Sequence, residues 1–306
     1  MKAPRIALFG PQKTPIVGVY HRLKAVITAP TQMVLDYRKD HGDLFTVRIP
    51  FKFDLTYFLT KEGCAAVLGL SAEEGRIGEV FLNVPCVGSS FPRSDMGADY
   101  VQTLVMAGRS FMASELLDKS ALESVPRIVH KTVDEHVSRW GGTIDLSTDF
   151  VELAFDASAR ACVGEKLWTR LEDEARPLLR DIVDGIDIPR AAFNTMPIRV
   201  FGKEYRASRR LHRLLVQVRE EHERTGAHPI FDRIAAIELR DGRRLPSEDV
   251  PWMLMYILWN AVSYPGSYST WALADIARHP SACAHAASLE ADARRRFYAE
   301  CFEETA

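Results

Sequence analysis

The sequence predicts a mainly α-helical fold with a small β-sheet near the N-terminus. From about residue 96 onward, apolar residues recur almost throughout at helical spacing. Near the N-terminus, LFTVRI (44–49) and DLTYFL (54–59) are short runs rich in β-branched and aromatic residues, joined by a short connection that contains Pro50. The chain has no internal repeat and no low-complexity tract, so a globular helical protein is expected.

Length and composition narrow the class of protein. The 306 residues are long enough for a sizeable core, and we predict a single domain over 1–306. The net charge of −2, without a basic stripe interleaved with aromatics, gives no reason to expect nucleic-acid binding. No apolar run approaches the roughly 18–20 residues of a membrane span. Five scattered cysteines without a CxxC pair indicate reduced thiols, and a cytoplasmic location is expected.

The N-terminal elements follow from local signals. A helix is predicted over 30–42, with Gly42 as its C-cap. The two strand-like runs then form a hairpin, and a short helix covers Lys61–Leu68. Residues 69–95 are rich in glycine, serine and proline and predict a long loop, which in a compact domain usually has a function.

The remaining chain predicts a succession of helices separated by short, glycine-containing breaks. Their expected ranges are 100–117, 122–140, 146–163, 167–183, 203–224 and 230–239. A turn over 238–250 follows, with Ser247 as the expected N-cap of the next helix.

The most informative segment is 251–280, which predicts one long, mostly apolar helix spanning roughly 247–278. Pro265 removes a backbone donor and clashes with the preceding turn, so a bend is expected there. The middle of this helix, which we call the waist, is small and polar, in contrast to its apolar ends. It includes Asn260, Ser263, Ser267, Ser269 and Thr270. The pattern suits a core helix whose waist borders a cavity; a buried helix with a tolerated proline is the alternative.

The last residues, RRRFYAECFEETA, predict a helix whose apolar pattern is still running where the sequence stops. Chain ends usually fray into polar sequence. We therefore expect this chain to be the N-terminal part of a longer protein. The common catalytic motifs, such as GxSxG, HExxH and the phosphate-binding loops, are absent, and the histidines are scattered without metal-ligand spacing.

The order of these segments resembles the cytochrome P450 family of haem-thiolate enzymes. The series runs from HGDLFTVRI through the hairpin, long loop and helices to the central helix ending ALADIARHP, and then to ECFEETA. The resemblance covers essentially the whole chain. It is closest to the branch containing sterol demethylases and relatives such as prostacyclin synthase. It implies a haem-thiolate oxidoreductase acting on a hydrophobic small molecule, such as a sterol or lipid.

The resemblance also implies roles for residues of the central helix. Asn260 and Ala261 match the small, polar turn that lies against haem b in the family. The family's proton-delivering threonine falls on Tyr264 or Pro265, so the usual acid–threonine pair is missing, and Ser263 or Tyr264 would be the substitute relay hydroxyl.

Other positions match the family outside this helix. Arg109 is the expected partner of a haem propionate, and Glu304 resembles the start of the structural Glu-x-x-Arg motif. Phe81, Val87 and Phe91 match the substrate-covering loop. The iron-ligating cysteine loop has no counterpart in this sequence. The resemblance further implies an electron-transfer partner, a ferredoxin or a reductase, for the complete protein.

Three hypotheses follow. The chain is a fragment of a haem-thiolate monooxygenase or related isomerase, a haem-free homologue that binds or activates another enzyme, or an unrelated helical protein that binds lipid.

Overall fold

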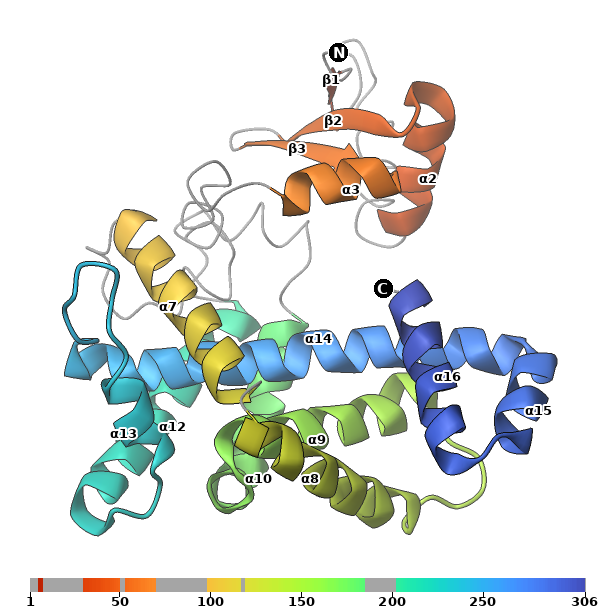
Figure 1. Ribbon diagram of the computed structural model, residues 1–306. Helices are drawn as coiled ribbons and strands as arrows, with labels where there is room; N and C mark the ends of the chain where they lie inside the picture. Colours follow the sequence, from red (N-terminus) through yellow and green to blue (C-terminus); the bar gives the residue numbers. More distant parts are fainter. Residues whose placement is uncertain are drawn as a thin grey trace. The chain divides into compact units, whose positions relative to one another are not determined.

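The computed structural model describes residues 5–7, 30–49, 53–69, 98–116, 119–184 and 202–305 (Figure 1). These residues are mostly helical with a small sheet, which confirms the predicted fold class. The chain divides into two compact units. One contains 1–89, 93–102 and 184–206, and the other contains 90–92, 103–183 and 207–306. Each unit is described by itself, and the single domain over 1–306 stays a prediction.

The first unit is built on a three-stranded sheet with the order β1-β2-β3. Its elements are β1 (Arg5–Ala7), α2 (Pro30–His41), β2 (Leu44–Ile49), β3 (Phe53–Phe58) and α3 (Lys61–Leu68). β2 and β3 form the predicted antiparallel hairpin, and β1 pairs in parallel with β2. Phe45 of β2 is fully buried because it stacks on Tyr57 and meets the edge of Tyr37 from α2. Gly42 adopts a positive φ of 84° and donates its amide to Arg38, which confirms the predicted C-cap.

The second unit is a helical assembly. Its helices are α7 (Ala98–Leu116), α8 (Lys119–Val137), α9 (Val151–Val163), α10 (Glu165–Val183), α12 (Lys203–Thr225), α13 (Ile230–Ala235), α14 (Val250–Arg278), α15 (Pro280–Ser288) and α16 (Ala291–Thr305). A π-helical turn over Leu146–Phe150 precedes α9. α14 runs through this unit with α9 alongside it (Figure 1). Nearly every residue from Val250 to Trp259 is buried, so the first half of α14 forms the core.

The predicted long helix is confirmed as α14, but its N-terminus differs from the prediction. Ser247 is not the N-cap, because Ser247–Asp249 forms a 3-10 turn and α14 begins only at Val250. The buried Asp249 occupies the cap position without a side-chain capping bond. Helical structure continues through Pro265 and Gly266. The bend at Pro265 stays a prediction.

The segment before α14 also corrects the sequence analysis. The helix predicted to reach residue 239 ends at Ala235. A small hairpin follows. The backbones of Glu238 and Arg244 form an antiparallel β-bridge, and the Leu239 amide donates to the Arg243 carbonyl. Gly242 supplies the positive φ of 79° that the turn requires. Among the described residues, no helix has both the length and the apolar character needed to cross a membrane.

A buried histidine lies at the connection of α12 and α13. His228 is 4% exposed, and neither ring nitrogen has a hydrogen-bond partner among the described residues. The backbone amide of His228 donates to Nδ1 of His222, so the His222 ring carries its hydrogen on Nε2. This His222 Nε2 lies 3.1 Å from the Asp232 carboxylate. Burial lowers the pKa of His228, partly opposed by Glu221. Burial also lowers the pKa of His212 on α12.

These histidines predict that acid destabilises the folded chain. The unfolded chain binds protons from about pH 6.5 downward, whereas the buried rings resist protonation. The contribution of these histidines to the free energy of unfolding is therefore fully present above about pH 6.5, and it is lost as the pH falls below that value. We expect His228→Leu to reduce the loss between pH 7.5 and 5.5 by about 1 kcal/mol in urea unfolding. His130→Leu, a change at an exposed histidine, should leave the loss unchanged; equal slopes for both variants would contradict the prediction.

Candidate cofactor-facing site

The waist of α14 presents a half-buried polar stripe. Asn260, Ser263 and Thr270 are three and seven residues apart, so they share one face of the helix. Each side chain donates to the carbonyl four residues earlier: Tyr256, Trp259 and Gly266, at 2.7, 2.6 and 2.6 Å. Such back-bonding keeps these polar groups close to the backbone and frequently bends helices.

The other side of the waist is covered by α9. Ala261, Val262 and Gly266 are buried. A Cβ placed on Gly266 would lie 3.6 Å from Val151 Cγ1, so α14 and the start of α9 are in close contact at that level. The waist therefore packs on α9 at the level of Gly266, while the described residues of the polar stripe stay half-buried.

The helix α7 crosses α14 one turn before the waist. A Cβ on Gly108 would lie 2.8 Å from Met253 Sδ and 2.8 Å from Tyr256 Cε1. Only a residue without a side chain permits this approach. Arg109 follows directly and is exposed. The structure thus brings the predicted propionate partner into the same part of the second unit as Asn260, Ala261 and Ser263.

A buried charge cluster that the sequence analysis missed holds α9 in place. Asp156 of α9 is 3% exposed and accepts from His136 Nε2 at 2.9 Å and Trp168 Nε1 at 3.2 Å. Arg176 Nη2 lies 2.7 Å from the same carboxylate, and its guanidinium lies 5.9 Å from the centre of the Trp168 ring. A lone aspartate within the apolar run FVELAFDASARACV was the available signal.

Three free cysteines lie in the described part of the chain. Burial raises the pKa of the Cys162 thiol to about 12, so that sulfur stays protonated. Cys64 and Cys283 are exposed, and the Cys283 thiol donates to the Ile276 carbonyl at 3.4 Å. The described residues also contain no group of three or more His, Cys, Asp or Glu that could hold a metal ion. The small waist suits the close approach of a flat cofactor. That the axial cysteine lies outside this chain stays a prediction.

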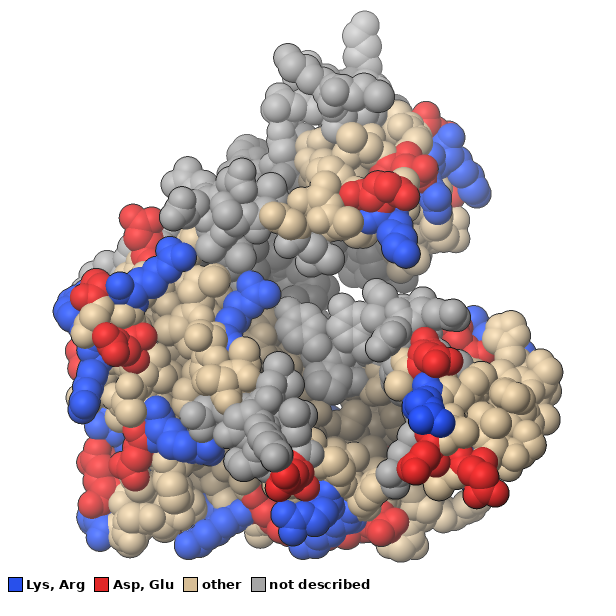
Figure 2. Space-filling model, viewed as in Figure 1, with Lys and Arg blue, Asp and Glu red and all other residues tan. Residues whose placement is uncertain are grey.

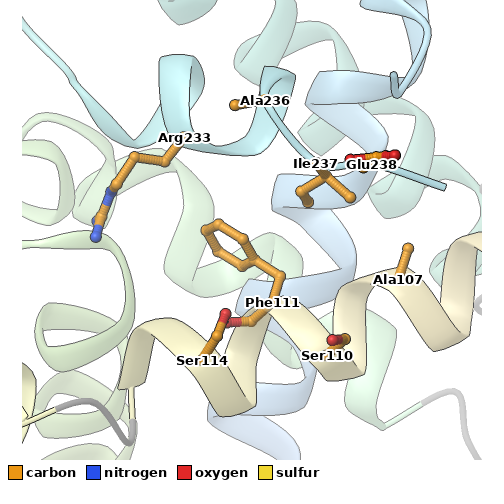
Figure 3. Close-up of a pocket in the computed structure, with 8 residues that line it drawn as sticks. All are labelled: Ala107, Ser110, Phe111, Ser114, Arg233, Ala236, Ile237 and Glu238. Carbon is orange, nitrogen blue, oxygen red and sulfur yellow. The ribbon is translucent and has the colours of Figure 1, made fainter. Parts of the chain in front are cut away.

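An open groove of about 340 Å³ lies between α7 and the segment after α13 (Figure 3). Phe111 extends from α7 toward α13, with Ser110 and Ser114 on the same helix and Ile237 and Glu238 opposite. None of the predicted site residues lines this groove.

The remaining predicted positions lie outside the described part of the chain. Phe81, Val87 and Phe91 fall within the undescribed stretch 70–97. Tyr264 and Glu304 belong to helices α14 and α16, but their side chains are not described. The roles assigned to these residues stay predictions.

Comparisons with known proteins give sequence relatives of one kind. Eburicol 14-alpha-demethylase of Uncinula necator is 22% identical over 264 residues, which are 82% of this chain and 49% of the relative. Sterol 14-demethylase of Arabidopsis thaliana is 22% identical over 87% of this chain and 53% of its own length. Obtusifoliol 14-alpha demethylase of Sorghum bicolor is 23% identical over 92% of this chain and 56% of its own length. The chain thus spans about half the length of these relatives. No family model matches the sequence.

Solved structures share the fold. Retinoic acid-bound cyanobacterial CYP120A1 superposes with a TM-score of 0.60 over 84% of this chain and 58% of that chain, at 14% identity. Cytochrome P450EX alpha with myristic acid superposes with a TM-score of 0.56 over 92% of this chain and 63% of that chain, also at 14% identity. The chain therefore has the cytochrome P450 fold. The sterol demethylases among its sequence relatives agree with this fold, and together they support the cytochrome P450 family predicted from the sequence.

Proposed function

We propose that this chain forms the haem-facing part of a cytochrome P450 oxidoreductase that acts on a hydrophobic small molecule. The observation that supports it most is the waist of α14. One side of the waist packs on α9, and the other presents Asn260, Ser263 and Thr270 beside the crossing with α7. Small residues there let a flat macrocycle approach the helix backbone, and Arg109 is available for a propionate.

Bound haem would supply the electron-transfer and oxygen chemistry, and the chain would supply position and proton access. In this proposal Asn260 lies beside the macrocycle, and the neighbouring Ala261, which is buried, contributes only a small side chain at that turn. Ser263 is the nearest described hydroxyl to the position of the family's relay threonine. To act as a relay, its hydroxyl would have to turn away from the Trp259 carbonyl, to which it donates at 2.6 Å, and donate toward the cofactor while its oxygen accepts a hydrogen bond.

The substrate class and the electron donor are proposed from the relatives. The relatives' names point to 14-demethylation of sterols, and the two neighbouring structures bind retinoic acid and myristic acid. We propose that the substrate is an extended, mainly apolar molecule of about the size of a sterol, retinoic acid or myristic acid. A ferredoxin or a reductase would supply electrons to the complete protein.

A second candidate function is a haem-free binding or activating protein with the P450 fold. The altered waist of α14 favours it, because the family's usual acid–threonine pair is missing there. The third hypothesis, an unrelated lipid-binding helical protein, has no support from the comparisons, since both gave cytochrome P450 relatives.

Haemin titration into the 306-residue chain tests the first proposal. We expect weak but saturable uptake that quenches tryptophan fluorescence, because Trp259 directly precedes the waist. We also expect no thiolate-type Soret band after reduction with carbon monoxide, because that spectrum needs a cysteine ligand. Replacing Ser263 with tryptophan should fill the stripe and weaken uptake about tenfold or more, equivalent to about 1.4 kcal/mol.

The matched control is Ser281→Trp, at an exposed position of α15, which should bind haemin like the unmodified chain. Both variants are checked for unchanged helical content by circular dichroism. Equal uptake by Ser263→Trp would show that haemin binds elsewhere and would contradict the proposed site. Saturable binding of a fluorescent fatty acid without haemin uptake would favour the haem-free alternative.

A further inference from the structure

A second groove lies beside α8, away from the waist of α14. Its volume is about 310 Å³. Its lining residues come from one face of α8, from α9 and from the first turn of α10. They are Ser124, Arg127, Ile128, Lys131 and Thr132 on α8, Arg160 on α9 and Glu165 on α10. The α8 residues are spaced by three and four positions, so they form a continuous wall.

The deepest cation in this groove lacks part of its hydrogen bonding. Arg160 is 9% exposed, and its Nη1 donates to Glu135 at 2.5 Å and to the Thr132 hydroxyl at 3.3 Å. Its Nη2 is 4.0 Å from Glu172. Its Nε is buried and has no hydrogen-bond partner among the described residues. Buried guanidinium donors are normally satisfied, so this one indicates a missing acceptor.

The charges around the groove favour an anion as that acceptor. Three cations line it against one carboxylate, Glu165, which pairs with Lys131. Glu135 lies beside the groove, where a hydrogen bond from Arg160 lowers its pKa. The groove also lies at the N-terminus of the 19-residue α10, where unpaired backbone amides add partial positive charge.

The distribution of charge at the surface limits the size of the ligand. On the face that Figure 2 shows, the coloured Lys and Arg atoms are interspersed with Asp and Glu atoms, and Lys131 itself lies 3.9 Å from Glu135. An extended polyanion such as a nucleic acid needs a broad basic surface. A compact anion can contact the three cations of the lining at once, but it must also fit beside Glu165 and compete with Glu135 for Arg160.

We propose that this groove binds a small oxyanion of the phosphate type, held by Arg127, Lys131 and Arg160. A tetrahedral anion has acceptor oxygens on several sides, which matches donors arriving from α8 and α9. Arginine donors suit phosphate oxygens because the planar guanidinium can donate two parallel hydrogen bonds. Free phosphate and the phosphate group of a small metabolite share this chemistry.

Phosphorus-31 NMR of inorganic phosphate titrated with the 306-residue chain tests the site. Sodium chloride keeps the ionic strength constant. We expect saturable line broadening and a rise in melting temperature beyond that given by chloride. Arg127→Gln should weaken phosphate binding about tenfold, the loss typical of one charged hydrogen-bonding partner. Arg213→Gln, the same change at an exposed position of α12, should leave binding unchanged.

Two further variants keep the test interpretable. Arg160→Lys retains the charge but removes the Nε donor, and it should weaken binding if it folds. The pair Arg127→Gln and Lys131→Gln, whose side chains are exposed, should abolish broadening even if Arg160→Lys does not fold. A repeat with glycerol phosphate distinguishes a metabolite from free phosphate by its tighter binding. Broadening that is not saturable, or equal for Arg127→Gln and Arg213→Gln, would overturn the proposal.

Discussion

Replacing Asp156 with asparagine is expected to cost about 3 kcal/mol of unfolding free energy. The buried carboxylate accepts hydrogen bonds from His136 and Trp168 and forms an ion pair with Arg176. Asparagine keeps the shape but removes the negative charge and turns an amide toward these donors. Trp168 and Arg176 share Oδ1, whereas His136 contacts Oδ2, so the single oxygen of asparagine cannot accept from all three side chains. Arg176 also loses the negative charge of its nearest carboxylate, and weakening a buried ion pair from one side is costly. Urea unfolding followed by tryptophan fluorescence measures the loss.

The matched control is Asp173→Asn on α10, where the side chain is exposed. It should change the free energy of unfolding by less than about 0.5 kcal/mol. A double variant, Asp156→Asn with Trp168→Phe, should lose less than the sum of its single changes, because the two residues share one hydrogen bond. A loss below about 1 kcal/mol for Asp156→Asn would show that water replaces the carboxylate and that the cluster does not stabilise α9.

Replacing Gly108 with valine is expected to separate α7 from α14 and to cost about 3 kcal/mol. The added Cβ alone would lie 2.8 Å from both Met253 and Tyr256. Both neighbours are buried, and Tyr256 stacks on Trp252 with ring centres 5.7 Å apart, so the Tyr256 ring can shift only if it disturbs that stacking. Since Arg109 is the next residue, the same change should also weaken haemin uptake.

Ala113→Val on the exposed side of α7 provides the control for the lower helix propensity of valine. We expect it to cost less than about 1 kcal/mol. Gly108→Ala should fall between these variants, because alanine gains up to about 1 kcal/mol of helix propensity while it meets the same contact. If Gly108→Val is tolerated within about 0.5 kcal/mol, the two helices do not cross as closely as the structure indicates.

Local patterns account for the parts of the fold that were predicted well. The hairpin, the helix 61–68 and the long central helix each follow from periodicity or turn residues within a short window. The predictions that were wrong concern ends of elements. Ser247 resembles an N-cap, but the buried Asp249 delays the start of α14 by a 3-10 turn. The helix after Pro229 ends early because the following residues pair in a hairpin.

The candidate site was predicted only in part. The polar waist was visible because small and hydroxylated residues interrupt an apolar helix. That Asn260, Ser263 and Thr270 share one face is a consequence of helical geometry, and the structure gives their back-bonding partners. The roles of Arg109, Tyr264 and the loop residues rest on the family resemblance and stay predictions.

By itself, the sequence determined the fold class, the order of the helices and the family resemblance, because helical periodicity and motif order are local properties of a chain. Only the tertiary structure determined which distant residues are in contact. Gly108 is an ordinary helical glycine until Tyr256, 148 positions later, lies against it. Asp156 and Arg160 are separate charged residues until α8 and α10 surround them. Burial and partner distance are set by packing between distant segments, and no spacing along the sequence encodes them directly.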